Sequence, residues 1–231
     1  MKPTNPSAKR GQDCLLASIS STELQALTSF VGTASSAALV LISTPLPFTT
    51  FKTQHFVNSD QRVVVTSADP DQRIVTEIDG LPAAEEYAQV VGADAQSLDP
   101  VRFAAQPVVV VINGMDYARS IQKVNADGSM TFFCAIDEGL VLRTAQCGDL
   151  VGNLEQAFAG IRGEIGEPLV VIGFDCILRK LEIVQQGLVD QVQALMGANT
   201  VVGFNTYGEQ YRGIHVNQTV TGIAIGRPRN A

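Results

Sequence analysis

Two residues in the segment Gly173-Phe174-Asp175-Cys176-Ile177-Leu178-Arg179 carry side chains suited to nucleophilic chemistry or anion binding. An apolar run ends in this segment and a helical pattern begins, which predicts Cys176 at a helix start and Arg179 one turn further on. A helix dipole and a guanidinium both lower the pKa of a thiol, and together they can also bind a carboxylate. The alternative is a core cysteine and an arginine paired with an acid, because free cysteines often behave as small hydrophobic residues.

Polar side chains are also concentrated between the last two apolar runs of the chain. Tyr207 and Glu209 follow the run Val201–Phe204, and His215 and Asn217 precede the final run. In an extended segment His215 and Asn217 point to the same side, and side chains at strand ends often project into pockets. These four residues are therefore candidates for the wall of a binding site, and a solvated loop is the alternative.

Catalysis by Cys176 would need a neighbouring base, and His215 has the right residue type. The spacing does not indicate contact between the two, and no third group is identifiable that would orient the base. His55 falls in an alternating stretch and is predicted to be an exposed strand residue. With two histidines and no Cys-x-x-Cys pair, the sequence predicts neither a metal site nor a catalytic residue.

The composition limits the classes of partner. The net charge of −7 disfavours nucleic acids and anionic membrane surfaces, which both attract basic proteins. With 45% hydrophobic and 17% charged residues the chain is globular, and no apolar run approaches the ~20 residues of a bilayer span. We therefore expect a soluble, cytoplasmic protein without nucleic-acid or membrane partners.

The hydrophobic pattern predicts an α+β fold with a mixed or antiparallel sheet and helices packed on it. Residues 1–19 show no periodicity, a capping box at 20–23 begins a short helix that ends at Gly32, and 37–43 has the pattern of a buried strand. The expected elements after residue 48 are a hairpin (62–78), a helix (82–92), a strand (107–112), a hairpin (117–136), a strand (139–145), a helix (149–162), a strand (168–174), a helix (176–196, capped by Asp175) and two strands (200–206 and 219–226).

Three segments resemble the C-terminal module of the FIST family (F-box and intracellular signal transduction). They are Phe174-Asp175-Cys176-x-x-Arg179, Gly203-Phe204-x-Thr206-Tyr207-Gly208-Glu209 and His215-x-Asn217-Gln218-Thr219. Upstream, Val75-x-Glu77-Ile78-Asp79-Gly80-x-Pro82-Ala83 resembles the junction between the two modules of that family. The resemblance implies a FIST C-terminal-like α+β sensory domain at 48–231, with the junction hairpin and helix at 62–92. Residues 1–47 would then be a tail and the remnant of an N-terminal module that is largely missing.

The resemblance also implies a function. FIST modules are expected to be sensory, ligand-binding and non-enzymatic parts of bacterial signal transduction, with amino acids as a proposed ligand class. Carried over position by position, the ligand-binding residues are Cys176, Arg179, Tyr207, Glu209, His215 and Asn217. Arg179 would bind a carboxylate, Glu209 an ammonium group, and the signal would pass to a partner such as a histidine kinase.

Three alternatives stay open at this point. The first is a haem-binding nitric-oxide sensor that regulates a histidine kinase, with His215, or else Cys176, as the axial ligand. The second is a Cys-dependent enzyme. The third is a partner-binding domain without a small-molecule site, which would expose an apolar patch.

Overall fold

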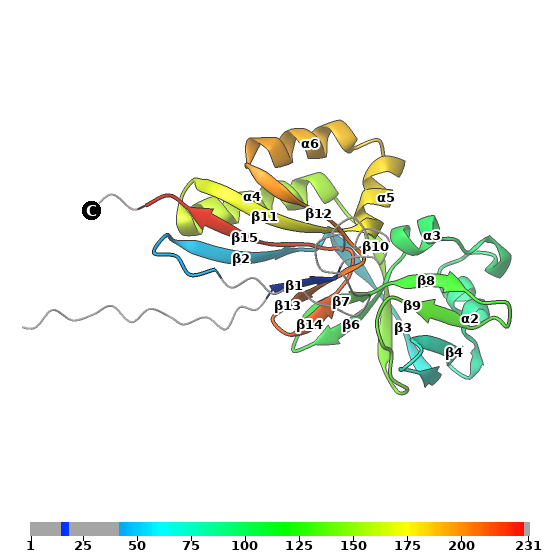
Figure 1. Ribbon diagram of the computed structural model, residues 1–231. Helices are drawn as coiled ribbons and strands as arrows, with labels where there is room; N and C mark the ends of the chain where they lie inside the picture. The colour runs from blue at the N-terminus through cyan, green and yellow to red at the C-terminus, as the bar shows by residue number, and fades with distance from the viewer. Residues whose placement is uncertain (1–14, 19–41, 229–231) are drawn as a thin grey trace, which may run out of the picture.

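The computed structural model describes residues 15–18 and 42–228, which form three β-sheets with helices packed against them (Figure 1). The sheets are mixed or antiparallel, so the predicted α+β fold is confirmed. The predicted helix at 20–32 lies outside the described residues, as does most of the predicted strand at 37–43. Ile42 and Ser43, the described end of that segment, are not in a strand.

The largest sheet has eight strands in the order β7-β6-β10-β3-β4-β9-β8, with β5 paired to β4. Its strands are β3 (Phe56–Asp69), β4 (Ile74–Ile78), β5 (Leu81–Pro82), β6 (Val108–Ile112), β7 (Met115–Arg119), β8 (Ile121–Val124), β9 (Met130–Phe132) and β10 (Val141–Cys147). All pairs are antiparallel, and the pairs β3–β4 and β8–β9 are the hairpins that the turn residues predicted. Helix α2 (Ala83–Val90) closes the core, where Tyr87 packs with Val65, Phe132 and Leu142.

The second sheet has the order β12-β11-β15-β2 and combines one parallel pair with antiparallel ones. Its strands are β2 (Phe48–Thr53), β11 (Pro168–Cys176), β12 (Val201–Thr206) and β15 (Val220–Gly226). The helices α4 (Leu150–Ile165), α5 (Ile177–Gln185) and α6 (Val189–Ala198) lie on one side of this sheet (Figure 1). Leu154 and Phe158 on the apolar stripe of α4 share a core with Val171 and Ala224 of the sheet.

The predicted single helix at 176–196 is wrong, because the chain forms α5 and α6 instead. The break falls at Gly187, whose φ of +69° cannot continue a right-handed helix. The apolar spacing runs through the break, so periodicity alone does not reveal it. Asp175 is not the helix cap either: Cys176 occupies that position, and the side chain of Asp175 accepts a hydrogen bond from Arg179.

The polar segment after β12 forms part of a third sheet, in the order β1-β13-β14. It consists of β1 (Leu15–Ser18), β13 (Gly208–Tyr211) and β14 (Ile214–Val216). Arg212 and Gly213 join β13 to β14 with φ values of +53° and +80°, the conformation of a tight hairpin turn. Glu209 and His215 are therefore held by a hairpin, not by a loop.

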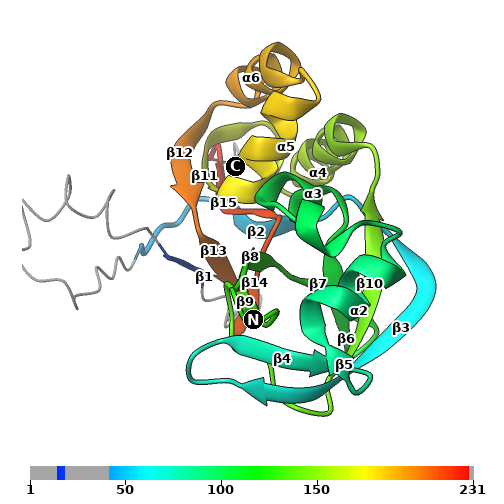
Figure 2. The same ribbon diagram turned by 90° about the vertical axis from the view of Figure 1, so that its right-hand side faces the viewer.

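Two further features differ from the sequence expectation. His55, predicted to be exposed, is only 5% exposed between β2 and β3. The 3₁₀ helix η1 (Ala95–Ser97) and helix α3 (Pro100–Ala105) were not predicted, since they are too short to show a period. Figure 2 shows α3 beside α5, so that this short helix connects the largest sheet with the helices of the second sheet.

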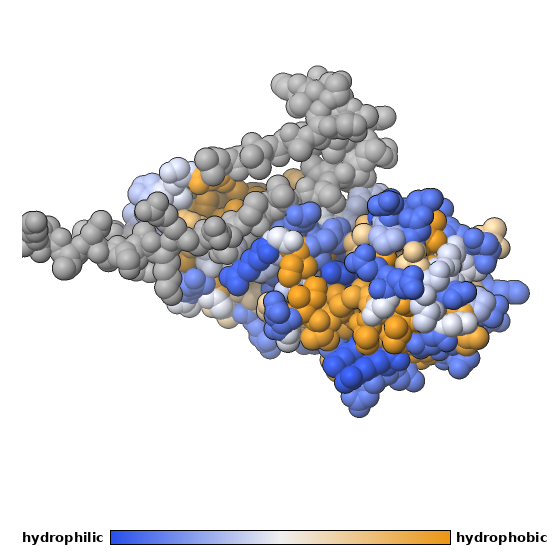
Figure 3. Space-filling model, turned by 90° about the horizontal axis from the view of Figure 1, so that it is seen from below, coloured by the Kyte–Doolittle hydropathy of each residue, from blue (hydrophilic) through white to orange (hydrophobic). Residues whose placement is uncertain are grey.

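The face of the molecule seen from below exposes a group of apolar side chains surrounded by hydrophilic ones (Figure 3). On the face of the largest sheet that points away from its core, strands β3, β6 and β10 each carry an exposed large hydrophobic residue, namely Val64, Val111 and Val141. Such a patch is the feature expected of a partner-binding surface. No helix in the described part of the chain is long and apolar enough to cross a membrane.

Candidate functional site

The junction between β11 and α5 holds a fully buried arginine. Arg179 donates from Nε to Oδ1 of Asp175 at 2.8 Å, and its Nη1 lies 3.3 Å from Nδ1 of His55. Its Nη2 is buried and has no hydrogen-bond partner. A buried donor that is left open costs free energy, so this atom is available to an acceptor from a ligand.

The thiol at the start of α5 is not activated. Cys176 is fully buried, and burial raises its pKa, an effect to which the nearby carboxyl group of Glu209 adds. The predicted lowering of this pKa by the helix dipole and Arg179 is therefore wrong, because desolvation of the thiolate outweighs both. The interpretation of Cys176 as a nucleophile loses its chemical basis.

Glu209 lies at the start of β13 with no exposed surface. Its carboxyl group accepts a hydrogen bond from Thr206 Oγ1 and another, at 2.7 Å, from Thr219 Oγ1. Burial raises the pKa of Glu209 to about 8. The two threonine hydroxyls and the charge of Arg179 oppose this shift, whereas the charge of Asp175 adds to it. At neutral pH Glu209 is therefore mainly a neutral hydrogen-bonding group, not an anion.

The remaining three predicted residues lie around the β13–β14 hairpin. Asn217 is buried and donates from Nδ2 to the carbonyl of Tyr207 at 3.3 Å, while Tyr207 itself is 40% exposed. His215 is partly buried, and a Cβ on Gly208 would lie only 2.8 Å from its Nε2. Burial lowers the pKa of His215, and the positive charge of Arg119 lowers it further. The side chain of Asn217 acts in the opposite direction, although Nε2 of His215 makes no hydrogen bond. His215 is thus a neutral imidazole at neutral pH.

The structure brings the three predicted segments together. Cys176 donates its backbone N–H to Thr219, Thr219 binds Glu209, and Glu209 lies within electrostatic range of Arg179. His215 and Asn217 pack against the glycine that precedes Glu209. The six residues therefore occupy one region, from the exposed Tyr207 to the buried Arg179, and their role in binding stays a prediction.

Open polar atoms are concentrated in this region. In the described part of the chain seven buried side-chain nitrogen or oxygen atoms have no hydrogen-bond partner, and three belong to the predicted residues: Nη2 of Arg179, Nε2 of His215 and Oδ1 of Asn217. They offer two nitrogen sites and one acceptor oxygen. Unpaired buried polar atoms are rare in folded proteins, and three of these seven belong to residues that the sequence analysis had already selected.

The charged network extends to residues that the sequence interpretation missed. His55 Nε2 lies 2.9 Å from Oε1 of Glu182, and Gln186 donates to the same oxygen at 3.0 Å. The i, i+4 spacing of Asp175 and Arg179 was a usable signal for their ion pair. Nothing local to His55 indicates that it packs against α5, since this contact bridges more than 120 residues of chain.

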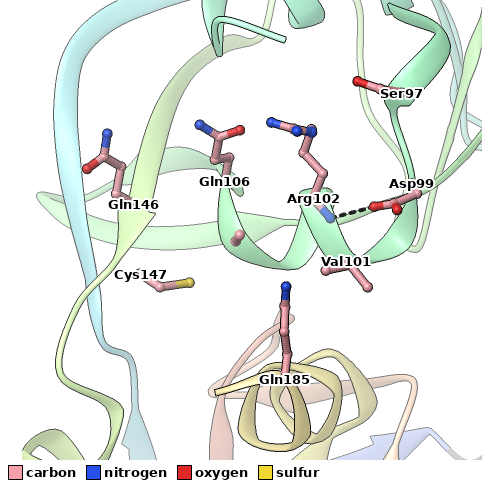
Figure 4. Close-up of a pocket in the computed structure, with 9 residues that line it drawn as sticks. Ser97, Asp99, Val101, Arg102, Gln106, Gln146, Cys147 and Gln185 are labelled. Carbon is pink, nitrogen blue, oxygen red and sulfur yellow. Dashed lines mark hydrogen bonds between the residues drawn. The ribbon is translucent and has the colours of Figure 1, made fainter. Parts of the chain in front are cut away.

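A pocket of about 520 Å³ opens beside this network, between α3, β10 and α5 (Figure 4). Its polar lining includes Arg102 from α3, Gln106 directly after that helix, Cys147 from β10 and Gln185 from α5. Gln106 contributes another buried open atom, its Oε1. The volume is within the range of small-molecule sites, so the pocket is large enough for a metabolite.

Comparison with known protein families gives two adjacent matches. The FIST C domain model matches residues 83–212, and the FIST N domain model matches residues 22–81. The two matches meet within the segment predicted to be a junction between modules. No curated protein and no solved structure matches the chain.

Proposed function

Because the chain belongs to the FIST family, whose domains are sensory domains of signal transduction, we propose that it is a non-enzymatic module that binds a small polar molecule. The proposed ligand class is the amino acids, and the signal passes to a partner protein such as a histidine kinase. The observation that supports this function best is the set of three open buried atoms on Arg179, His215 and Asn217.

These atoms have the donor and acceptor types that bind the two charged ends of an amino acid. A carboxylate accepts a charge-assisted hydrogen bond from Nη2 of Arg179, and an ammonium group donates to Oδ1 of Asn217. Tyr207, at the exposed edge of the region, has a hydroxyl with no hydrogen bond to any described residue, so it can contact the ligand or the entrance.

Glu209 gives the proposal a measurable signature. A ligand ammonium group placed beside it favours the carboxylate form and lowers its pKa. With a pKa of about 8 in the free protein, Glu209 carries roughly 0.9 proton at pH 7, so binding should release close to one proton. A ligand that places no ammonium group beside Glu209 would release no proton.

The first experiment is a thermal-shift screen of amino acids and small carboxylates, followed by calorimetric titration of each hit. Titrations at pH 7 in two buffers of different ionisation enthalpy give the number of protons released. We expect about 0.9 proton for the wild type and none for Glu209→Gln. We expect Tyr207→Phe to weaken binding 5- to 30-fold, and the matched variant Tyr211→Phe, in the same hairpin, to leave it unchanged.

Two results would count against this function. One is a screen in which no amino acid or carboxylate shifts the melting temperature. The other is a hit whose affinity responds equally to Tyr207→Phe and Tyr211→Phe, which would place its site elsewhere on the molecule.

Haem is the second candidate ligand, because His215 carries an open Nε2 and a lowered pKa that keeps the imidazole neutral. The fit is poor in this arrangement, since the backbone at Gly208 lies directly against the ring. A haem would supply gas binding if the hairpin moved away from His215. Haem titration of the purified protein tests this: the absence of a Soret band that depends on His215 removes haem from consideration.

A further inference from the structure

Three side chains outside the predicted site form a cluster of metal-ligating type. His55 and Glu182 are buried, Cys147 is partly buried, and one ligand atom of each lies within 4.8 Å of the other two. His55 Nε2 is 2.9 Å from Oε1 and 3.0 Å from Oε2 of Glu182. The Cys147 thiol donates to the Ala104 carbonyl at 3.2 Å. Imidazole, thiolate and carboxylate are the three common protein ligands of zinc.

The backbone holds His55 and Cys147 in a fixed frame. Cys147 is the last residue of β10 and pairs with Phe56, the neighbour of His55 in sequence. The next residue, Gly148, donates its N–H to the His55 carbonyl at 2.7 Å. A Cβ on Gly148 would lie 2.8 Å from that oxygen, so this close approach requires glycine. Ligands fixed by backbone hydrogen bonds at the ends of paired strands are well preorganised.

The cluster can be reached from solution. Cys147 belongs both to the cluster and to the lining of the 520 Å³ pocket. Its sulfur points into the space between β10 and the helix that carries Gln185 (Figure 4). An ion or a small solute that enters the pocket can therefore contact this thiol, whose sulfur lies within 4.8 Å of ligand atoms of Glu182 and His55.

We propose that His55, Cys147 and Glu182 bind one divalent transition-metal ion of the zinc type, with a fourth position left for a ligand from the pocket. Three protein ligands and one open position are typical of zinc sites that interact with small molecules. The thiolate disfavours magnesium and calcium, which prefer oxygen ligands. One thiolate and one carboxylate neutralise the charge of a dication. The neighbouring Arg179 and Asp175 form an ion pair whose two charges cancel.

Metal binding requires one change in the network. Bond lengths of roughly 2.0–2.3 Å place the ion between Nε2 of His55 and Glu182, so the imidazole proton must reside on Nδ1. That nitrogen now faces Nη1 of Arg179 at 3.3 Å. The guanidinium therefore has to turn away from His55, which its bond from Nε to Asp175 permits.

Cobalt substitution tests the site directly, because Co²⁺ bound to a thiolate gives a charge-transfer band in the near ultraviolet. We expect one equivalent of Co²⁺ to produce the band, and one equivalent of Zn²⁺ to abolish it. Cys147→Ser should remove the band, and Glu182→Gln should weaken zinc binding at least 10-fold in competition with a chromophoric chelator. Cys134→Ser, at another buried thiol, should change neither quantity.

Far-UV circular dichroism of each variant checks that it is folded, and Cys147→Ala provides a second variant if the serine protein is not. Absence of the band in the wild type overturns the proposal, as does a band that persists in a folded Cys147 variant. Both readouts are independent of amino-acid binding, so failure of the metal site and failure of the proposed function are distinguishable.

Discussion

Glu209→Gln is the most informative single substitution, because the folded protein holds Glu209 in its protonated form. Glutamine has the shape and hydrogen-bonding groups of a protonated glutamate: its oxygen can accept from one of the two threonine hydroxyls, and its amide can donate to the other. The substitution therefore removes the titration of this group and keeps its contacts. Below pH 5 we expect the variant to be about as stable as the wild type.

The magnitude follows from linkage. Raising the pKa from its ordinary value of 4.5 to about 8 corresponds to roughly 4–5 kcal/mol, at about 1.36 kcal/mol per pH unit. The folded state binds more protons than the unfolded state between these values. The stability of the wild type therefore falls as the pH rises from about 4.5 to about 8, and this contribution is lost above pH 8. Glu209→Gln has no such titrating group and does not lose this stability, so by pH 9 it should be more stable than the wild type by up to about 4 kcal/mol.

Urea unfolding followed by far-UV circular dichroism at pH 5, 7 and 9 measures this difference, since the chain has no tryptophan to report by fluorescence. Both proteins contain the other titrating groups, so the contributions of these groups cancel in the difference between the two free energies of unfolding. Glu155→Gln, at an exposed position on α4, is the matched control and should give a curve parallel to the wild type. If the Glu209→Gln curve is also parallel, the carboxyl group is not held protonated, and the proton release expected on ligand binding has no source.

Other perturbations test the remaining parts of the structure. Arg179→Met leaves a partly buried Asp175 without its partner and should cost about 3 kcal/mol in urea unfolding, part of which Asp175→Asn should restore in the double variant. Gly187→Ala, at a φ of +69°, should destabilise by roughly 1–2 kcal/mol, whereas Gly160→Ala, in open space on α4, should stabilise by roughly 0.5–1 kcal/mol. Cys176 should resist iodoacetamide at pH 8 until the protein unfolds, because burial raises its pKa; rapid modification of the Cys176 peptide, detected by mass spectrometry, would contradict its placement in the core.

Much of the fold could be predicted because its elements have strong local signals. The apolar run at 107–112 and the Asp127-Gly128 turn specify strands and a hairpin through chemistry within a few residues. The errors occur where local signals compete. The apolar spacing continues through Gly187, so the helical period hides the one residue whose backbone breaks the helix.

The site was predicted less completely, for a physical reason. Residue types at the ends of β11 and β12 indicated Arg179 and Glu209, but the direction of a pKa shift depends on burial, which composition does not give. Desolvation raised the pKa of Cys176 where the nearby charge and dipole predicted a decrease. His55 shows the same limit, because its partners Glu182 and Arg179 come from a helix more than 120 residues away in sequence.

Helix α5 links the two proposed sites and implies that they are coupled. Arg179, in its first turn, offers Nη2 to the proposed ligand and Nη1 to His55, and Glu182 follows one turn later. A metal on His55 and Glu182 places a proton on Nδ1 of His55, which displaces the guanidinium and so changes the donor available to a carboxylate. Coupling between two binding sites is reciprocal, so zinc should change the dissociation constant of the amino acid by the same factor by which the amino acid changes that of zinc. Titrations of each ligand with and without the other measure both factors. An effect of zinc on amino-acid binding that is lost in Cys147→Ser would show that the coupling runs through the proposed metal site, whereas tight binding of both ligands with no mutual effect would mean that the guanidinium serves only one of them.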